Sequence, residues 1–238
     1  MKRIAVVVAM AVAAASCNRV HPGAVPVGAG AELTQLANNG ARLTYQATYR
    51  YTTSGQLAPG VATRLQIIQR PPASVRKLET STPGPDGRPL TVRSWQATDA
   101  KGSYSCTDYL GLGTRCLPNA LPVSTFHSAQ LDELFDAPRR NGYFANIARA
   151  AARARIAGQV TTCFQATPAG TSGTVLYELC YTSDGILLRA RRTVAASVPG
   201  NVDARREAVA EAITVERSVS PADLRLPGAV VNPADLRR

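Results

Sequence analysis

Five cysteines offer the clearest chemistry in this chain of 238 residues. Cys17 stands alone, directly after the small residues Ala14-Ala15-Ser16. An unpaired cysteine in an exported chain needs a reason, such as modification of its thiol. The small residues before Cys17 match a lipobox, which predicts acylation of this thiol in a bacterial lipoprotein. The other four cysteines form two pairs that are close in sequence, Cys106 with Cys116 and Cys163 with Cys180.

The segment before Cys17 has the layout of a secretory signal peptide. A basic start, Met1-Lys2-Arg3, is followed by an uncharged apolar run from Ile4 to Ala15. This run is shorter than the about 20 residues that a membrane-spanning helix needs. We therefore expect residues 1–16 to be removed on export. Cleavage by an ordinary signal peptidase near Ala15, with Cys17 as a bystander, is the alternative.

An acylated Cys17 would hold the protein on the extracytoplasmic face of a bacterial membrane. Two or more acyl chains anchor a protein stably, whereas one chain binds only marginally. Residues 17–30 carry glycines and prolines without apolar periodicity, so we interpret them as a lipidated, flexible tether. Fully extended, such a tether spans about 45 Å.

The chain is basic, with a formal net charge of +11 that falls to +9 when Lys2 and Arg3 leave with the signal peptide. Export argues against nucleic acid as the partner, and no nucleic-acid-binding motif is present. Attraction to anionic lipid head groups fits better, because each basic residue near the bilayer contributes about 1 kcal/mol. Alternatively, the charge reflects a GC-rich genome and only keeps the surface soluble.

Side chains that could form a catalytic centre are few and scattered. A hydrolase needs a nucleophile, a base and an orienting acid, but the chain has no GxSxG motif. Ser172 lies in a predicted turn, His21 in the tether and His127 at a predicted helix start. We expect no catalytic residue, metal site or cofactor. Three acidic residues cluster on one predicted helix and complement its dipole: Asp132, Glu133 and Asp136.

The spacing of the other four cysteines favours local disulfides. Nine residues, including two glycines, separate Cys106 from Cys116, and a turn at PAGTSG separates the predicted strands of Cys163 and Cys180. Opposed hairpin positions bring Cβ atoms within disulfide reach. Each closed loop contributes about 3 kcal/mol in the chain-entropy account. Redox activity or metal binding is the alternative, although the chain has no CxxC and only two histidines.

Alternating apolar and polar residues predict strands through most of the chain. The pattern is clearest over residues 41–51, where apolar and aromatic side chains alternate with Arg, Thr and Gln. Two later hairpins are predicted to turn at 157–158 and 183–185, and a last segment, 209–219, reads as a strand or equally as a helix. Other strands are predicted in the stretches VATRLQII, SVRKLET, TVRSWQA and GSYSCTD.

Three segments have helical spacing of apolar residues. They are a short leading helix at 31–38 and a central pair at 124–136 and 141–154. We expect residues 31–238 to form a single domain of mainly β (α+β) class. Its strands would make a strongly curved, unclosed antiparallel sheet, with the central helices as a lid over the concave apolar face.

This order of elements resembles a known family. An acylated cysteine, a tether, a leading helix and a long first strand precede the phrases IAGQVTTCFQAT, YELCYTSDGILLRA and SPADLRLP. Over nearly all of residues 31–238 the chain resembles the LolA/LolB-like superfamily of bacterial envelope proteins, including LppX/LprG-type lipoproteins. The resemblance implies a half-barrel whose helices cover an apolar cavity for acyl chains. Only four phenylalanines and one tryptophan are present, which would make such a cavity smaller.

The first functional hypothesis is a lipoprotein that binds a lipid or acyl chain. Burying a 16-carbon chain such as palmitate would contribute roughly 10 kcal/mol before ordering costs, so no polar anchor is needed. The same side chains could instead simply fill a core. The predicted pocket is lined from the sheet by Leu43, Tyr45, Tyr49, Leu65 and Ile67, and from the lid by Leu131, Leu134, Phe135, Phe144 and Ile147.

The second hypothesis is a sensor or adaptor that presents a surface to a membrane protein partner, without ligand or catalysis. The basic charge and the tether suit this role equally well. An envelope protein with no ligand is a third possibility, and an enzyme is the least favoured.

Overall fold

The computed structural model describes residues 28–54, 61–108, 113–118, 131, 133–171, 174–195 and 205–231. Cys17, the predicted signal peptide, all but the end of the tether, and residues 124–130 and 132 of the first predicted lid helix lie outside them, as do His127 and Ser172.

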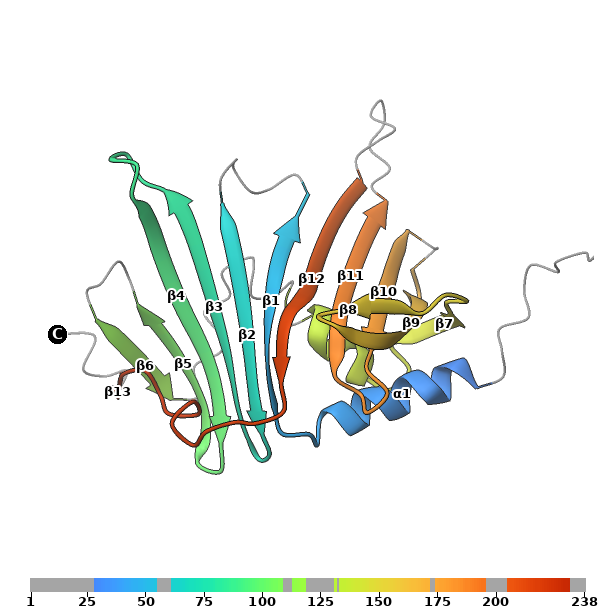
Figure 1. The fold of residues 1–238 in the computed structure, drawn as a ribbon, viewed down its shortest axis with the longest axis horizontal. Helices are drawn as coiled ribbons and strands as arrows, with labels where there is room; N and C mark the ends of the chain where they lie inside the picture. The colour runs from blue at the N-terminus through green and yellow to red at the C-terminus, as the bar shows by residue number, and fades with distance from the viewer. Residues whose placement is uncertain are drawn as a thin grey trace, which may run out of the picture.

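The described residues form one helix at the start and then a large sheet (Figure 1). The helix α1 spans Ala29–Gly40. The strands are β1 (Tyr45–Thr53), β2 (Ala62–Arg70), β3 (Ala73–Pro83), β4 (Pro89–Asp99), β5 (Gly102–Asp108), β6 (Thr114–Pro118), β7 (Phe144–Arg149), β8 (Ala154–Ile156), β9 (Gln159–Pro168), β10 (Val175–Tyr181), β11 (Leu187–Ala195), β12 (Arg205–Glu216) and β13 (Ala229–Val230).

The sheet has the order β13-β6-β5-β4-β3-β2-β1-β12-β11-β10-β9-β7, with β8 beside β9. Its pairs are antiparallel except β13 with β6. β13 and β7 lie at opposite edges, and no described pairing joins them (Figure 1). The predicted curved, unclosed antiparallel sheet is therefore confirmed.

β1 shows why the alternating segment forms a strand and why it starts late. Tyr45, Ala47, Tyr49 and Tyr51 are all buried on one face, as a period of two requires. The strand begins at Tyr45 rather than at residue 41, because residues 41–43 donate their backbone N–H groups to α1 carbonyls. Those groups are not available for the sheet ladder.

The predicted helix at 141–154 is wrong. This segment forms β7 and the start of β8, and β7 pairs with β9, with Ile147 opposite Ala166. Its alanines favour a helix, but intrinsic propensity is weak against tertiary contacts. A backbone paired with β9 still lets Phe144 and Ile147 pack against the core. The central helix pair is therefore reduced to one helix followed by a 3-10 turn.

That one helix covers the concave face of the sheet. Residues 131 and 133–136 are helical and continue into the 3-10 helix η1 (Ala137–Arg139). We call residues 131 and 133–139 together the lid helix. Leu131, Leu134 and Phe135 belong to the same buried cluster as the inward side chains of β1 and β2.

A glycine–glycine contact fixes α1 against the turn between β10 and β11. It contacts η1 and β7, and its last residue, Gly40, lies against Gly185 in the β10–β11 turn. A Cβ at Gly40 would lie 2.1 Å from the Gly185 carbonyl oxygen, and Gly185 has a φ of +106°. Only glycine fits both positions, so the turn predicted at 183–185 also docks the helix.

The convex face carries a second, smaller cluster. Ile68, Val75 and Ala97 are buried there, beneath Leu224 and Leu226 from the chain that follows β12. This chain crosses beneath β1–β5 to β13, which lies at the edge of the sheet beside β6 (Figure 1). The 209–219 segment is a strand, since β12 lies between β1 and β11. β6 and β13 were not predicted.

Candidate functional site

The ten residues of the predicted pocket converge on the concave face. Seven are buried in one cluster: Tyr45, Tyr49, Leu65, Ile67, Leu131, Leu134 and Phe135. Leu43, Phe144 and Ile147 are partly buried and pack against it. Leu43 lies before β1, and Phe144 and Ile147 lie on β7 rather than on a lid helix. The ten side chains therefore share one apolar cluster, as the sequence predicted, although three of them lie on other elements than expected.

Within this cluster the lid helix is packed directly on the sheet. The rings of Tyr49 and Phe135 meet edge to face, with centroids 5.1 Å apart. Tyr49 and Leu134 are fully buried, and the Tyr49 hydroxyl donates to the Leu187 carbonyl at 2.8 Å. Burial raises the pKa of Tyr49 well above its usual value. In these described residues, the protein's own side chains occupy the place that an acyl chain would take.

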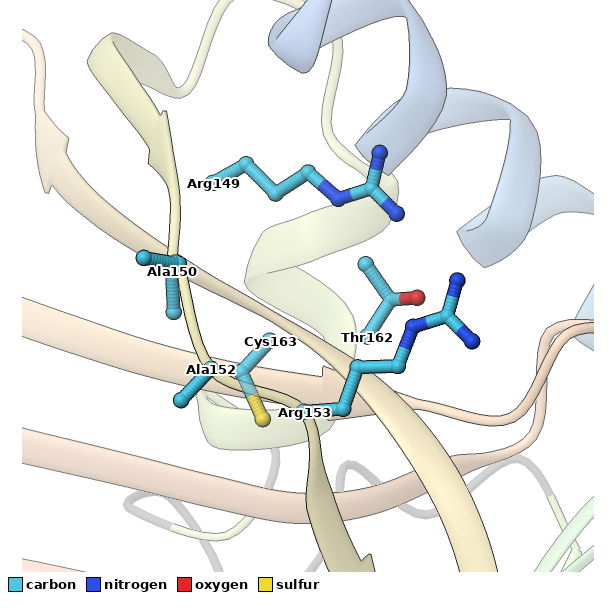
Figure 2. Close-up of a pocket in the computed structure, with 7 residues that line it drawn as sticks. Arg149, Ala150, Ala152, Arg153, Thr162 and Cys163 are labelled. Carbon is cyan, nitrogen blue, oxygen red and sulfur yellow. The ribbon is translucent and has the colours of Figure 1, made fainter.

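A hollow of about 440 Å³ lies elsewhere, beside β7 and β9 (Figure 2). It is lined by residues 149–153 together with Thr162 and Cys163. Arg149 and Arg153 extend in the same direction, toward α1 (Figure 2), and Arg149 Nη1 lies 3.5 Å from Glu32 Oε2. Two arginines line this hollow beside three alanines, so it lacks the large apolar side chains that would bury an acyl chain. A second hollow, of about 500 Å³, follows the exposed polar side of α1.

Two ion pairs attach the lid helix to strands on either side of the cluster. On β3, Arg76 forms a two-pronged contact with Asp136, at 3.1 Å from Nη1 to Oδ2 and 2.6 Å from Nη2 to Oδ1. On β11, Arg192 Nε lies 3.6 Å from Glu133 Oε1. Three strands, β2, β1 and β12, lie between β3 and β11. The lid helix therefore crosses the concave face above these three strands.

Glu133 is also held by two tyrosines. The Tyr177 hydroxyl donates to Glu133 Oε1 at 2.9 Å and the Tyr143 hydroxyl at 3.0 Å. Burial, and then the neighbouring Tyr143 and Glu133, raise the pKa of Tyr177. Both phenols therefore stay protonated and available as donors at neutral pH. A neutral hydroxyl pair and a guanidinium around one carboxylate form a small anion-binding cluster at the edge of an apolar core.

These polar residues are what sequence reasoning missed. The acidic residues of the helix were explained by its dipole, whereas Asp136 and Glu133 contact arginines 60 and 59 positions away. Arg76 and Arg192 each sit on the apolar face of an otherwise alternating strand. The sequence did contain one signal for these contacts. An arginine at an inward position of a strand needs an acidic partner, and the predicted lid helix carries such acids.

The two predicted disulfides are confirmed. Cys106 bonds to Cys116 and Cys163 bonds to Cys180, each with Cα atoms 4.0 Å apart on directly opposed strand positions. Glu178 lies beside the second disulfide. Metal ligation by cysteine requires thiolates, which disulfide sulfurs do not provide.

In the described parts of the chain, no helix combines the length and hydropathy that a membrane span requires. No family model matches the sequence, and no curated protein is similar to it at a significant level.

Comparison with solved structures finds several similar chains, and two of them are described here. The structure of LprF from Mycobacterium bovis has 12% identity and a TM-score of 0.47, over 87% of this chain and 100% of that chain. The structure of MucB in complex with MucA(peri) has 15% identity and a TM-score of 0.39, over 83% of this chain. This chain spans 59% of the length of that MucB chain.

Proposed function

We propose that the protein is an exported binding protein, anchored to a bacterial membrane through acylated Cys17, that takes an acyl chain onto the concave face of its half-barrel. The observation that supports this most is the convergence of the ten predicted residues on a single apolar cluster. This cluster is covered by one short helix.

Ligand entry would require the lid helix to leave the sheet. Leu134 and Phe135 fill the apolar space, and an acyl chain of similar hydrophobicity would replace them there. The apolar contacts of the helix are thereby exchanged for those of the ligand, so the loss is small. Its remaining attachments, at Arg76 and Arg192, are ion pairs whose arginines are about a quarter exposed. Water can therefore replace these contacts when the helix moves.

Native mass spectrometry of the full-length protein, extracted gently from membranes, tests the proposal. We expect one amphiphile bound per protein, together with a mass increment of acyl groups on the peptide that begins at Cys17. The Cys17→Ser variant should lose the increment and leave the membrane fraction, but keep the bound amphiphile when supplied with it. Wild-type protein that is repeatedly free of any amphiphile would contradict the carrier role.

An adaptor that binds a membrane protein is the second candidate, and the filled interior favours it. Tyr49 and Leu134 are fully buried by the protein's own side chains, as a ligand-free scaffold requires. In that case crosslinking in intact cells should join the protein to one dominant membrane protein, and the extracted protein should carry no amphiphile.

A further inference from the structure

Glu133 is a carboxylate held by three polar side chains at the edge of the apolar cluster. Its Oε1 atom accepts hydrogen bonds from Tyr177 and Tyr143 and faces Arg192. The next two residues, Leu134 and Phe135, are buried in the apolar cluster. An anion directly followed by an apolar body is the chemistry of a fatty acid or an alkyl phosphate. The lid helix therefore presents to the sheet the same pattern that such a ligand would present.

Among the described residues, three buried polar atoms without hydrogen-bond partners lie on the concave face, at the end where Arg192 lies. Arg192 Nε, Thr53 Oγ1 and Thr63 Oγ1 are buried and accept or donate no hydrogen bond within the described residues. Arg192 and Thr53 both lie opposite Ala208 on β12, and Thr63 lies opposite Tyr51. Folded proteins leave few such atoms. A fourth, Asp108 Oδ1, lies away from this end, on β5.

We propose that Arg192, Tyr143 and Tyr177 form a binding site for the anionic head group, a carboxylate or a phosphate, of a single-chain amphiphile. Glu133 is the internal competitor that occupies this site until the ligand's anion replaces it. Because the tail would lie on the same apolar cluster, this head-group site rests on the proposed function. Arg192 and Glu133 are 24% and 31% exposed, so an anion can reach them from solvent.

The exchange of one anion for another explains how the ligand would be selected. The guanidinium of Arg192 matches carboxylate or phosphate geometry and keeps a partner in both states. A neutral amphiphile would displace Glu133 and leave Arg192 without a negative partner. A site built around a charge rejects the uncharged analogue for this reason. The site therefore favours palmitate or hexadecyl phosphate over hexadecanol, although the three tails are the same.

Affinities of full-length wild type and two variants for these three amphiphiles test the site, measured by displacement of a fluorescent fatty-acid probe. Glu133→Gln removes the competing charge from the closed state, and because all three tails displace the same helix, we expect the affinity for each amphiphile to rise about tenfold, with the preference for the charged ones kept. Arg192→Met should abolish the preference for charged amphiphiles. If only palmitate or only hexadecyl phosphate is preferred over hexadecanol in wild type, and Arg192→Met removes that preference, the head group is identified as a carboxylate or a phosphate.

Asp136→Asn is the matched control. It loosens the same helix at its other attachment, to Arg76, and does not touch the head-group site. It should therefore raise the affinity for all three amphiphiles equally. Tyr143→Phe removes one donor and should weaken the preference for charged amphiphiles without abolishing it. Circular dichroism verifies that each variant is folded.

Two results would overturn the head-group site. One is a preference for charged amphiphiles that persists unchanged in Arg192→Met, which would mean that Arg192 does not hold the head group. The other is no gain in affinity for any amphiphile in Glu133→Gln, which would mean that Glu133 is not a competitor. If charged and neutral amphiphiles bind wild type equally, the head-group site fails and the carrier role stands. If none of the three binds, both proposals fail.

Discussion

Arg76 on β3 and Asp136 on the lid helix are joined by two hydrogen bonds, the shorter of 2.6 Å. They lie 60 positions apart in sequence, and their contact is one of the two ion pairs that hold the helix over the sheet. Both side chains remain partly exposed, at 24% and 36%.

Because solvent screens this pair, its removal should cost little. We expect Asp136→Asn to lower the free energy of unfolding by about 1 kcal/mol, measured by urea denaturation. Arg88→Met is the control, since the 4.0 Å ion pair of Arg88 with Asp86 is mostly exposed, and it should leave stability unchanged. An equal effect of both variants would show that Arg76 and Asp136 do not hold the helix.

Leu134→Ala should affect stability and ligand binding in opposite directions. Leu134 is fully buried, so its truncation should lower the free energy of unfolding by about 2–5 kcal/mol. The lid helix then packs less tightly on the apolar cluster and is more easily displaced by a ligand, which should tighten palmitate binding by about tenfold. Leu176→Ala, at an exposed position of β10, should change neither quantity. A loss of stability with weaker palmitate binding would contradict displacement of the helix.

The two disulfides should stabilise the fold independently, because they lie on opposite halves of the sheet. Replacing Cys163 and Cys180 by alanine should lower the free energy of unfolding by about 3 kcal/mol, and replacing Cys106 and Cys116 should have a similar effect. Additive losses in the variant lacking all four would confirm independence. Peptide mapping under non-reducing conditions checks the pairing, and any peptide that links one pair to the other would refute it.

Buried phenols predict a loss of stability at alkaline pH. Burial raises the pKa of six tyrosines in the described part of the chain, to about 12 for Tyr51. The unfolded chain therefore releases its phenolic protons first, near pH 10, and the stability present below that pH falls as pH rises further. The six are Tyr45, Tyr49, Tyr51, Tyr143, Tyr177 and Tyr181.

Absorbance at 295 nm measures this difference. At pH 11 the native protein should show clearly less phenolate than the same protein in guanidinium chloride. A native titration curve that coincides with the denatured one would contradict the burial of these rings.

Features set by neighbours in sequence were predictable. The alternation in β1, the turn at 183–185 and the cysteines of facing strands all follow from local spacing, and the structure has each of them. The curvature of the sheet followed from the number of alternating segments. For the strand, the turn and the disulfides, the residues that decide the structure lie within about twenty positions of one another.

Features set by distant partners were not predictable in this way. Residues 144–149 form a strand because β9 supplies their hydrogen bonds, although their own composition favours a helix. The start of β1 shifted because α1 takes the backbone donors of residues 41–43. Glu133 and Arg192 meet only after β11 has joined the sheet next to β12. No local pattern marks such a contact.

Photo-crosslinking with a 16-carbon fatty acid that carries a diazirine near its tail tests most directly whether the concave face holds an acyl chain. After irradiation of the full-length protein, peptide mapping should place the label on β1 and β2, at Tyr49, Leu65 or Ile67, with excess palmitate abolishing it. Labelling of the convex face, or labelling that palmitate does not compete away, would contradict a binding site beneath the lid helix.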